Sequence, residues 1–388
     1  MTPSRKKTKK NSSNRRHVSV SIRDVAKRAG VSISTVSRAV NGITSVEPKL
    51  AKRVWKAVAE VGYVPNPQAR ALVMGRSRML GLIVSDITNQ FFPELVKEFE
   101  ILAVEQDYEV LIGSTHYDPA RTCLLIRRML QRNVDGVAIM TFGIEGDDIK
   151  KLVENDYPLV FVDAGPKLPN TRILNVNKGE GIRAAVQHLV DLGHRAIAFI
   201  SGPLYLPSAL TRRDAFVSSM AELGLKVPAG YIIEGDHTME GGMAGIERIV
   251  SHAELPTAVV CSNDMTAIGV LHGLYKTPYK VPADISVVGF DDIHLAQFVL
   301  PPLTTVQVSC KNLAAAAVQA LRAGIEPDHP RAAQREWQIP TCLVVRQSTA
   351  IPRGPTLQSR PRDASRKPSS ARSKSRHHAT NELALTQL

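Results

Sequence analysis

The sequence predicts a multidomain protein in which a small all-α head precedes an α/β core built from two doubly wound parallel sheets. Two short amphipathic helices close to the N-terminus predict the head. From Met79 onward, apolar β-rich runs alternate with helix-length segments, and near residue 172 this alternation begins again. Because such alternation indicates a parallel sheet covered on both faces, the two series predict two halves with a cleft at the carboxyl ends of their strands.

The head begins with a helix of about two turns that follows Ser21. Ser21 and Asp24 stand at the two positions of a capping box, which satisfies free N–H groups at a helix start. The residues that recur at helical spacing and form one apolar stripe are Ile22, Val25, Ala26 and Ala29. A helix this short needs to bury that stripe against another element.

A second helix follows the turn at Gly30-Val31, with Ser32 as its N-cap. Its inward stripe consists of Val36, Ala39 and Val40, and its outward face of Ile33, Ser34, Ser37, Arg38 and Asn41. Two helices joined by a short turn that contains Gly, the second with a small, polar and basic outer face, predict a helix-turn-helix that fits the major groove of double-stranded DNA. The alternative is a pair of surface helices in a larger all-α domain.

A third helix over residues 48–60 argues against this alternative. Pro48 occupies the first helical position, and Gly62 and Pro65 end the helix. The residues spaced to close a three-helix core are Leu50, Val54, Ala57, Val58 and Val61. We therefore expect the head to comprise residues 18–66.

The strands of the core are predicted by two series of apolar runs. The first series is LGLIV, YEVLIG, VDGVAIM and PLVFVD, and the second is RAIAFISG, YIIEGD, TAVVCSND and ISVVGFDD. A chain of 388 residues is too long for one ordinary core, and 44% apolar with 5% aromatic residues fits a globular α/β protein.

The net charge of +13 is distributed unevenly along the chain. Residues 1–17 contribute +7, residues 18–78 contribute +8 and residues 353–388 contribute +6, so residues 79–352 carry −8. This distribution confines attraction for phosphates to the head and the two ends, because an acidic core repels a polyanion.

Cysteine usage and hydropathy bear on the compartment. The four cysteines, at 123, 261, 310 and 342, include no CxxC pair, so neither a zinc site nor a disulfide framework is predicted. The N-terminal segment lacks the apolar stretch of a signal peptide, and no apolar run approaches the roughly 20 residues of a membrane span. We expect a cytoplasmic, nucleoid-associated protein without membrane contact.

Eight strings follow one another along the chain: DVAKRAGVSISTVSRAVNG, GYVPNPQARAL, GLIVSDITNQFF, VDGV, HLVDLGHRAIAFISG, SNDMTAIG, VPADISVVGFDDI and PPLTTV. In this order, over residues 20–349, they resemble the lactose-repressor family of bacterial transcription regulators. The first string matches the head signature of that family almost letter for letter. The resemblance implies a repressor that binds operator DNA and has a periplasmic-binding-protein-like core, switched by a small-molecule effector.

The resemblance also implies that the chain crosses between the two halves of the core three times. We expect subdomain 1 to comprise residues 79–172 and 303–327, and subdomain 2 residues 173–302 and 328–350. The other expected segments are a disordered basic arm at 1–17, a hinge helix and linker at 67–78, and a disordered basic tail at 351–388. Some members of the family form tetramers through a C-terminal coiled coil. The terminal NELALTQL spans barely one heptad, which is too short for such a coiled coil, so we expect a homodimer.

On the head, the resemblance assigns DNA contacts to the second helix. Ile33, Ser34 and Arg38 are expected to contact base edges, and an Arg can bind guanine through two hydrogen bonds. Contacts to phosphates are expected from Ser32, Thr35, Ser37 and Asn41. In the hinge helix, Leu72 matches the leucine that wedges between the central base pairs from the minor groove.

In the core, the resemblance places effector contacts on both sides of the cleft. On the first half, Phe91 and Phe92 are expected to stack on the ligand, with a plain core contact as the alternative for one of them. Asp86 is expected to accept a hydrogen bond from a ligand hydroxyl or to cap the following turn. Asp163, at the end of PLVFVD, matches a ligand contact of the family.

On the second half, Ser208 and Arg212 are four residues apart and point the same way on a helix. Arg212 is the strongest candidate, because its five donors suit a carboxylate or neighbouring hydroxyls. Asn263 and Asp291 complete the hydrogen-bonding set, whereas Asp264 is expected to cap the next helix. His237 stands where the family often has an aromatic contact, so we expect a sugar or sugar acid rather than a nucleobase.

No catalytic residue, metal site or cofactor is predicted. The GxGxxA at Gly179, Gly181 and Ala184 lacks the acidic residue that a dinucleotide site needs about 20 positions later, so it indicates a helix packed closely on a sheet. The aspartates expected at strand ends also fit the acid and base of a hydrolase; they are Asp86, Asp163, Asp264, Asp291 and Asp292. The competing interpretation is therefore a sugar-binding protein or carbohydrate enzyme with a minor DNA-binding role.

Overall fold

The computed structural model describes residues 20–42, 46–65, 71, 75–141, 157–163, 165, 170–326 and 328–353. The expected basic arm, the tail beyond residue 353 and the hinge helix, apart from Ala71, lie outside these residues. So does Leu72. Within the described residues, no helix combines the length and apolarity needed to cross a membrane.

The head consists of the three predicted helices, α1 (Ile22–Ala29), α2 (Ile33–Val40) and α3 (Pro48–Val61). The Asp24 carboxylate accepts hydrogen bonds from the Ser21 N–H and hydroxyl, both at 2.8 Å. Ser32 Oγ accepts the Thr35 N–H at 3.1 Å, which confirms its capping role. The buried core is Val25, Ala26, Ala29, Val36, Ala39, Val54, Ala57 and Val58, whereas Leu50 is only partly buried.

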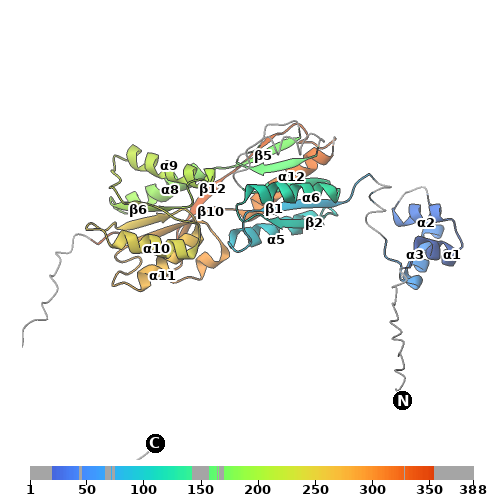
Figure 1. The fold of residues 1–388 in the computed structure, drawn as a ribbon, viewed down its shortest axis with the longest axis horizontal. Helices are drawn as coiled ribbons and strands as arrows, with labels where there is room; N and C mark the ends of the chain where they lie inside the picture. Colours follow the sequence, from blue (N-terminus) through green and yellow to red (C-terminus); the bar gives the residue numbers. More distant parts are fainter. Residues whose placement is uncertain are drawn as a thin grey trace, which may run out of the picture. The chain divides into compact units, whose positions relative to one another are not determined.

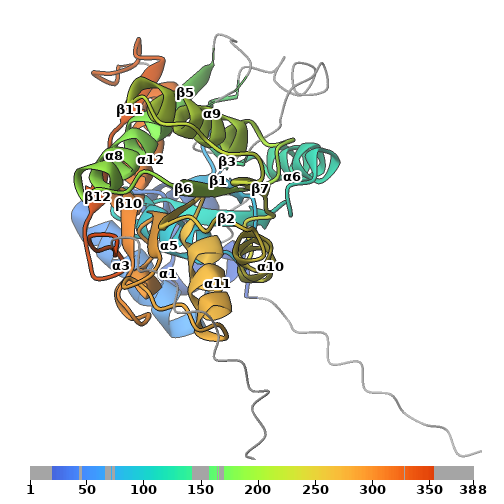
Figure 2. The same cartoon turned by 90° about the vertical axis from the view of Figure 1, so that its left-hand side faces the viewer.

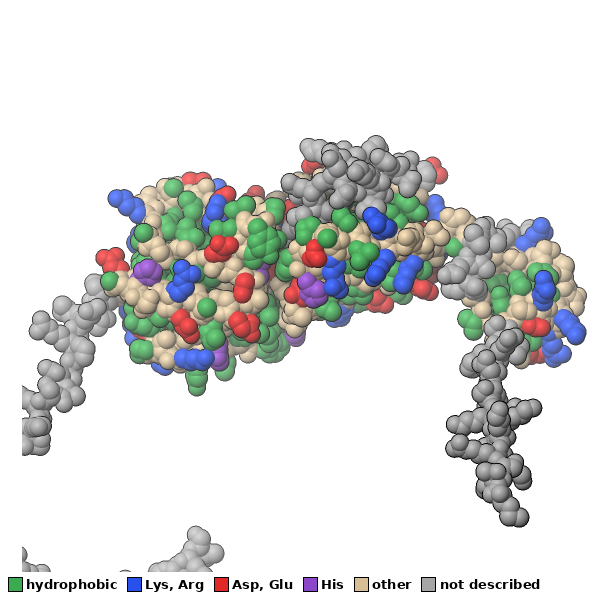
Figure 3. Space-filling view, in the orientation of Figure 1, with side chains coloured by type: hydrophobic (Ala, Val, Ile, Leu, Met, Phe, Trp, Pro, Cys, Tyr) green, Lys and Arg blue, Asp and Glu red, His purple; other side chains and the backbone are tan. Residues whose placement is uncertain are grey.

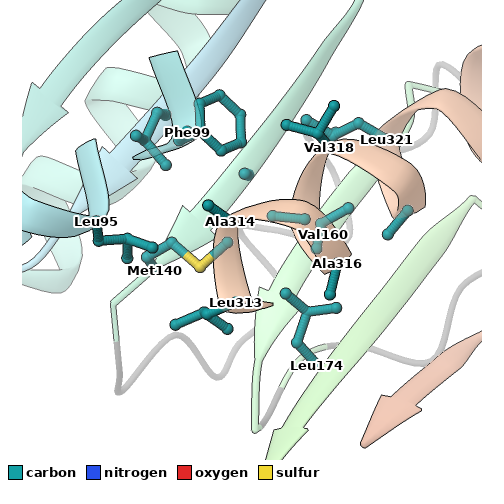
Figure 4. Packing of buried hydrophobic residues seen from close by; sticks show 14 of the residues in the cluster. Leu95, Phe99, Met140, Val160, Leu174, Leu313, Ala314, Ala316, Val318 and Leu321 are labelled. Atoms are coloured by element: carbon teal, nitrogen blue, oxygen red, sulfur yellow. The ribbon is translucent and has the colours of Figure 1, made fainter. Parts of the chain in front are cut away.

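Lobe 1 of the core is a six-stranded parallel sheet in the order β11-β5-β4-β3-β1-β2. Figure 1 labels β1, β2 and β5 of this sheet beside α5, α6 and α12. Helices α5 and α12 cover one face, where Leu95 and Phe99 lie beside Ala314 (Figure 4), and α6 covers the other. Its elements are β1 (Met79–Val84), α5 (Phe91–Val104), β2 (Glu109–Ser114), α6 (Pro119–Gln131), β3 (Gly136–Met140), β4 (Leu159–Val162), β5 (Thr171–Val176), α12 (Cys310–Ile325) and β11 (Glu336–Ile339).

Lobe 2 contains the second sheet, in the order β12-β10-β9-β8-β6-β7, in which β12 pairs antiparallel with β10. Figure 2 shows α8 and α9 on one side of this sheet and α10 and α11 on the other. Its elements are α8 (Lys178–Asp191), β6 (Ile197–Ser201), α9 (Pro207–Glu222), β7 (Ile232–Glu234), α10 (Met239–Val250), β8 (Ala258–Cys261), α11 (Asp264–Tyr275), β9 (Ser286–Asp291), the 3-10 helix η1 (His294–Gln297), β10 (Thr304–Val308) and β12 (Thr341–Val344).

The two doubly wound lobes confirm the predicted fold class, and all eight strands predicted by the apolar runs are present. The sequence pattern missed four further strands, namely β5, β10, β11 and β12. The first two are short runs that mix polar residues with apolar ones, and the last two are edge strands. An edge strand needs less apolar sequence because one of its sides is not covered by a neighbour.

The subdomain boundaries predicted at 172/173, 302/303 and 327/328 are wrong, although the three crossings are present. β5 extends lobe 1 to Val176, and β10 belongs to lobe 2, so the second crossing comes between Val308 and Cys310. β11 pairs with β5, and the third crossing falls at Pro340. The reason is that backbone pairing with a partner distant in sequence, rather than local composition, decides which sheet takes a crossing strand.

Candidate functional site

The outer face of α2 presents the side chains expected to read DNA. Val36 and Ala39 are buried against α1 and α3, so the opposite side of the helix, with Ser34 and Arg38, is exposed. Ile33 is 46% exposed, so this apolar side chain also lies on the outer face. This face carries short polar groups, one apolar group and one long cation.

The remaining side chains of the predicted DNA-binding set are linked to one another. The Ser32 hydroxyl lies 2.8 Å from both the Ser34 and the Thr35 hydroxyls, and Asn41 Nδ2 donates to Ser37 Oγ at 3.4 Å. The Ser32, Ser34 and Thr35 hydroxyls lie at the start of α2, where helix N–H groups favour an anion, whereas Ser37 and Asn41 lie at its end.

Basic side chains gather on the rest of the head. Between residues 20 and 65, every Lys and Arg is exposed, and Figure 3 shows blue side chains over this unit. They are Arg23, Lys27, Arg28, Arg38, Lys49, Lys52, Arg53 and Lys56, against the acidic residues Asp24, Glu47 and Glu60. One ion pair, Arg28 with Glu60 at 2.5 Å, neutralises part of this charge.

A cavity enclosing about 610 Å³, part of it open to solvent, lies between the two lobes. Side chains at the carboxyl ends of the strands and at the starts of α5, α9 and α12 line it, as expected for doubly wound sheets. The predicted effector residues that line it are Phe91, Phe92, Ser208, Arg212, His237, Asn263 and Asp291. The structure thus brings together residues separated by up to 200 positions in sequence.

Arg212 is the buried cation of this cavity. It is 8% exposed, its Nη2 lies 3.6 Å from Asp291 Oδ1, and its guanidinium carbon lies 4.2 Å from the centre of the Phe290 ring. Its Nε has no hydrogen-bond partner among the described residues. Burial lowers the pKa of Arg212, and the charge of Asp291 opposes that effect. A buried cation with an unused donor is unfavourable unless a ligand supplies an acceptor.

Asp291 is the acidic partner in the cavity. It ends β9 with a φ of 114° and is 7% exposed. Burial raises its pKa to about 7, although the charges of Arg212 and Lys178 both act to lower it. The carboxyl therefore changes between a hydrogen-bond donor and an acceptor close to neutral pH.

His237 fills the place where an aromatic ligand contact was expected. Its ring Nδ1 lies 3.0 Å from the Ser262 hydroxyl, and burial together with the nearby Arg212 lowers its pKa to about 3. The ring is therefore neutral at physiological pH. Gly202 leaves room for it, because a Cβ at that position would lie 2.0 Å from the ring.

Asn263, not Asp264, caps α11. Asn263 Oδ1 accepts the Thr266 N–H at 2.9 Å, and its Nδ2 donates to the His237 carbonyl at 3.1 Å. Asp264 is fully buried and accepts hydrogen bonds from Thr305 Oγ1 at 2.5 Å and from the Ile293 N–H at 2.9 Å. Burial raises its pKa well above the ordinary value. Asp264 thus joins the start of α11 to β10 and to the segment that follows β9 in lobe 2.

Two predicted effector residues do not line the main cavity. Asp163 is ion-paired with the buried Lys178, and its Oδ1 accepts the Val176 N–H at 2.9 Å. Asp86 accepts the Thr88 N–H at 2.9 Å, which is the turn-capping alternative. Asp86 lines a second pocket that shares Asn89, Tyr117 and His237 with the main cavity.

Three polar cavity residues were not predicted, namely Asn89, Tyr117 and Lys178. Asn89 lies inside DITNQFF, so its place beside the phenylalanines was a usable signal. Tyr117 has a φ of 60° in a loop, and burial raises the pKa of its hydroxyl. Lys178 is 4% exposed, and nothing in its sequence neighbourhood distinguishes it from a surface lysine.

The remaining sequence motifs have structural explanations. In the GxGxxA segment, a Cβ on Gly181 would lie 2.5 Å from Val306, so the glycine permits close packing of α8 on the second sheet, as predicted. Among the described residues, no three His, Cys, Asp or Glu side chains converge to hold a metal ion.

Comparison with known proteins adds to this geometry. A family model described as bacterial regulatory proteins, lacI family, matches residues 21–66, and one described as a periplasmic binding protein-like domain matches residues 186–349. The catabolite control protein A of Priestia megaterium is 32% identical over 305 residues, which are 78% of this chain and 92% of that protein. The ribose operon repressor of Escherichia coli K12 is 33% identical over 330 residues, 84% of this chain and 99% of that repressor.

Solved structures with the same fold include regulators bound to DNA and to sugars. The lac repressor dimer bound to operator and the anti-inducer ONPF has a TM-score of 0.76 and 28% identity, over 85% of this chain and 99% of that one. A complex of the transcriptional regulator CelR with cellobiose has a TM-score of 0.63 and 25% identity, also over 85% of this chain and 99% of that one.

Proposed function

Because the chain belongs to the lacI family of bacterial regulatory proteins and is a DNA-binding transcriptional regulator, we propose that it is a repressor that binds a pseudo-palindromic operator as a homodimer. A sugar-like effector in the cavity between the lobes switches it. The observation that carries the effector assignment is Arg212, a buried cation whose Nε donor has no partner among the described residues.

Operator reading is assigned to the outer face of α2, with Arg38 as the long base-contacting side chain. A single short helix offers few base contacts, so specificity is supplied by two heads on half-sites about one helical turn apart. Leu72 remains predicted to wedge between the central base pairs; Leu72→Ala should keep the dimer and lose operator bending. With DNA as its target, the protein acts in the cytoplasm.

Exposed apolar side chains on lobe 1 support a dimer. They belong to the edge strand β2 and to α5 and α6, each of which contacts β2. Ile101, Val104, Ile112 and Leu124 are between 40% and 54% exposed. Apolar groups gathered on neighbouring elements favour contact with a second subunit.

The cavity suits a polyhydroxylated ring better than a nucleobase. Arg212 and Ser208 can donate to hydroxyls, Asp291 can accept, and Phe91 offers an apolar surface for a ring. The neutral His237, held by Ser262, replaces the larger aromatic surface on which a flat base would stack. Sugars and sugar acids are therefore the effector class we propose.

The positions of the carboxylates support ligand binding rather than catalysis in the core. Glycoside hydrolysis uses two carboxyl groups on opposite sides of the bond. Of the aspartates expected at strand ends, only Asp291 lines the main cavity. Asp86 lines the neighbouring pocket and accepts the Thr88 N–H, and the other three bind protein groups, namely Asp163, Asp264 and Asp292. We infer that the core has no enzyme activity.

The experiment that tests the function has two stages. The purified chain selects duplexes from a random pool, and D-ribose, D-galactose, D-gluconate, cellobiose and hypoxanthine are tested for thermal stabilisation. We expect a duplex of two-fold symmetry, a melting temperature raised by a sugar or sugar acid, and a change in operator affinity with that compound. Selection of asymmetric duplexes, stabilisation by hypoxanthine alone, or turnover of a glycoside would overturn the proposal.

A further inference from the structure

Asp135 binds the segment that joins the linker to lobe 1. One of its carboxylate oxygens accepts the Ser77 N–H at 2.7 Å and the Ser77 hydroxyl at 2.9 Å, and the other accepts the Arg78 N–H at 3.0 Å. Arg78 has a φ of 58°, and successive N–H groups in such a turn converge on an anion. Asp135 itself precedes β3 and donates its N–H to the Met79 carbonyl at 2.7 Å.

Two arginine side chains extend this attachment. Arg76 Nη2 donates to the carbonyl of Ile325, the last residue of α12, at 3.2 Å. The Arg78 guanidinium lies over the Tyr108 ring, 5.4 Å from its centre. A helix C-terminus attracts a cation because its last carbonyls are unpaired and carry partial negative charge. Residues 76–78 are therefore held by the start of β3, the end of α12 and the loop before β2.

This attachment lies at the far end of two helices that begin at the cavity. α5 starts at Phe91 and α12 carries Leu313 in its first turn, and both side chains line the cavity. α12 has 16 residues and so spans about 24 Å to Ile325. The two helices pack together (Figure 4), and beyond the end of α5 Gln106 accepts a hydrogen bond from Arg322 Nη1 at 2.7 Å.

We propose that Asp135 is a positioning residue for DNA binding: with the end of α12, it fixes residues 76–78 on lobe 1 and so restricts the course of the linker. This inference rests on the proposed function, since it concerns operator affinity. A linker without this attachment has more conformations to lose when both heads bind one operator, so operator affinity falls. Asp135 contacts no phosphate in this arrangement, so the salt dependence of binding does not change.

Asp135→Asn and Arg76→Gln test the attachment in the full chain, with Asp107→Asn as the matched control. Asp107 is exposed beside Tyr108, and its substitution removes the same charge without touching Ser77 or Arg78. The first readout is the rate of trypsin cleavage after Arg76 and after Arg78, resolved by mass spectrometry. Both sites are present in Asp135→Asn, whereas Arg76→Gln keeps only the site after Arg78. The second is the affinity, at several salt concentrations, for the duplex that the wild-type chain selects.

We expect Asp135→Asn to be cleaved at least about fivefold faster and to bind the selected duplex about tenfold more weakly, with an unchanged salt slope. Arg76→Gln should change both in the same direction, and Asp107→Asn should match wild type. Cleavage and affinity of Asp135→Asn within twofold of wild type would overturn the inference. If the wild-type chain selects no duplex, the proposed function fails, whereas the cleavage rates still decide whether Asp135 holds the linker.

Discussion

The buried carboxyl of Asp291 should make the free energy of unfolding depend on pH near neutrality. Its pKa is about 7 in the folded protein, against 3.8 for an ordinary aspartate, and burial is the main cause. Between pH 3.8 and pH 7, the Asp291 carboxyl is mostly protonated in the folded protein and mostly ionised in the unfolded chain. The stability that Asp291 contributes is therefore fully present below pH 3.8 and is lost as the pH rises to 7.

The size of this effect follows from the linkage of protons to folding. While Asp291 is protonated in the folded state alone, the free energy of unfolding falls by about 1.4 kcal/mol per pH unit. From pH 5 to 7 the loss is about 2 kcal/mol, since the carboxyl is half ionised at the upper limit. Arg212 at 3.6 Å already stabilises the ionised form, so this loss is what remains after the ion pair has formed.

Asp291→Asn removes the titration while keeping the shape of the side chain and tolerance for the positive φ. We would measure urea denaturation by far-UV circular dichroism at pH 5, 6 and 7 for wild type, Asp291→Asn and Asp236→Asn. Asp236 is an exposed carboxylate at the same end of lobe 2, so its substitution controls for the loss of one charge.

The stability of wild type relative to Asp291→Asn should fall by about 2 kcal/mol between pH 5 and 7. The difference between wild type and Asp236→Asn should stay constant over that range. A constant difference for Asp291→Asn as well would refute the reasoning, because it would mean that Asp291 is ionised in the folded cavity throughout.

Three further outcomes are expected. Arg38→Ala should weaken operator binding by about 1–3 kcal/mol per half-site and relax the base preference at one position in each half-site. Repeating the duplex selection with this variant measures the preference, and an unchanged selected sequence would contradict the proposed base contact of Arg38. Arg212→Leu should abolish stabilisation by the sugar found in the thermal screen while preserving operator affinity. A full thermal shift in this variant would show that Arg212 does not contribute to sugar binding. Ile112→Glu should shift the dimer toward monomer in analytical ultracentrifugation, because it buries a charge in an apolar contact; Tyr205→Glu, at an exposed side chain of lobe 2, is the control and should leave the oligomer intact.

The head was predictable from sequence nearly residue by residue. Its helices are short, their apolar stripes recur at helical spacing, and their ends carry local signals such as Ser32 and Gly62. Each of these signals acts within a few residues, so no knowledge of distant contacts was needed. The eight apolar strands of the core were predictable for the same reason, since buried parallel strands are nearly continuous apolar runs.

The site was predictable only in part. Arg212 and Asp291 follow from the resemblance of their strings to a known family, and both line the cavity. Lys178 was missed, and Asp163 is ion-paired with it instead of lining the main cavity; this ion pair joins the end of β4 to the start of α8. Asp264 was misassigned because its carboxylate binds Thr305 and the Ile293 N–H rather than its own helix.

The sequence by itself determined the kinds of element, their order and the small, polar and basic outer face of α2, because helix caps, turns and apolar periodicity are local. Tertiary structure alone decided which sheet takes each crossing strand, which carboxylates are available to a ligand, and that Asp135 holds the end of the linker. These outcomes depend on backbone pairing and on hydrogen bonds between residues tens to hundreds of positions apart. Such contacts exist only in the folded arrangement of the two sheets, and local composition does not encode them.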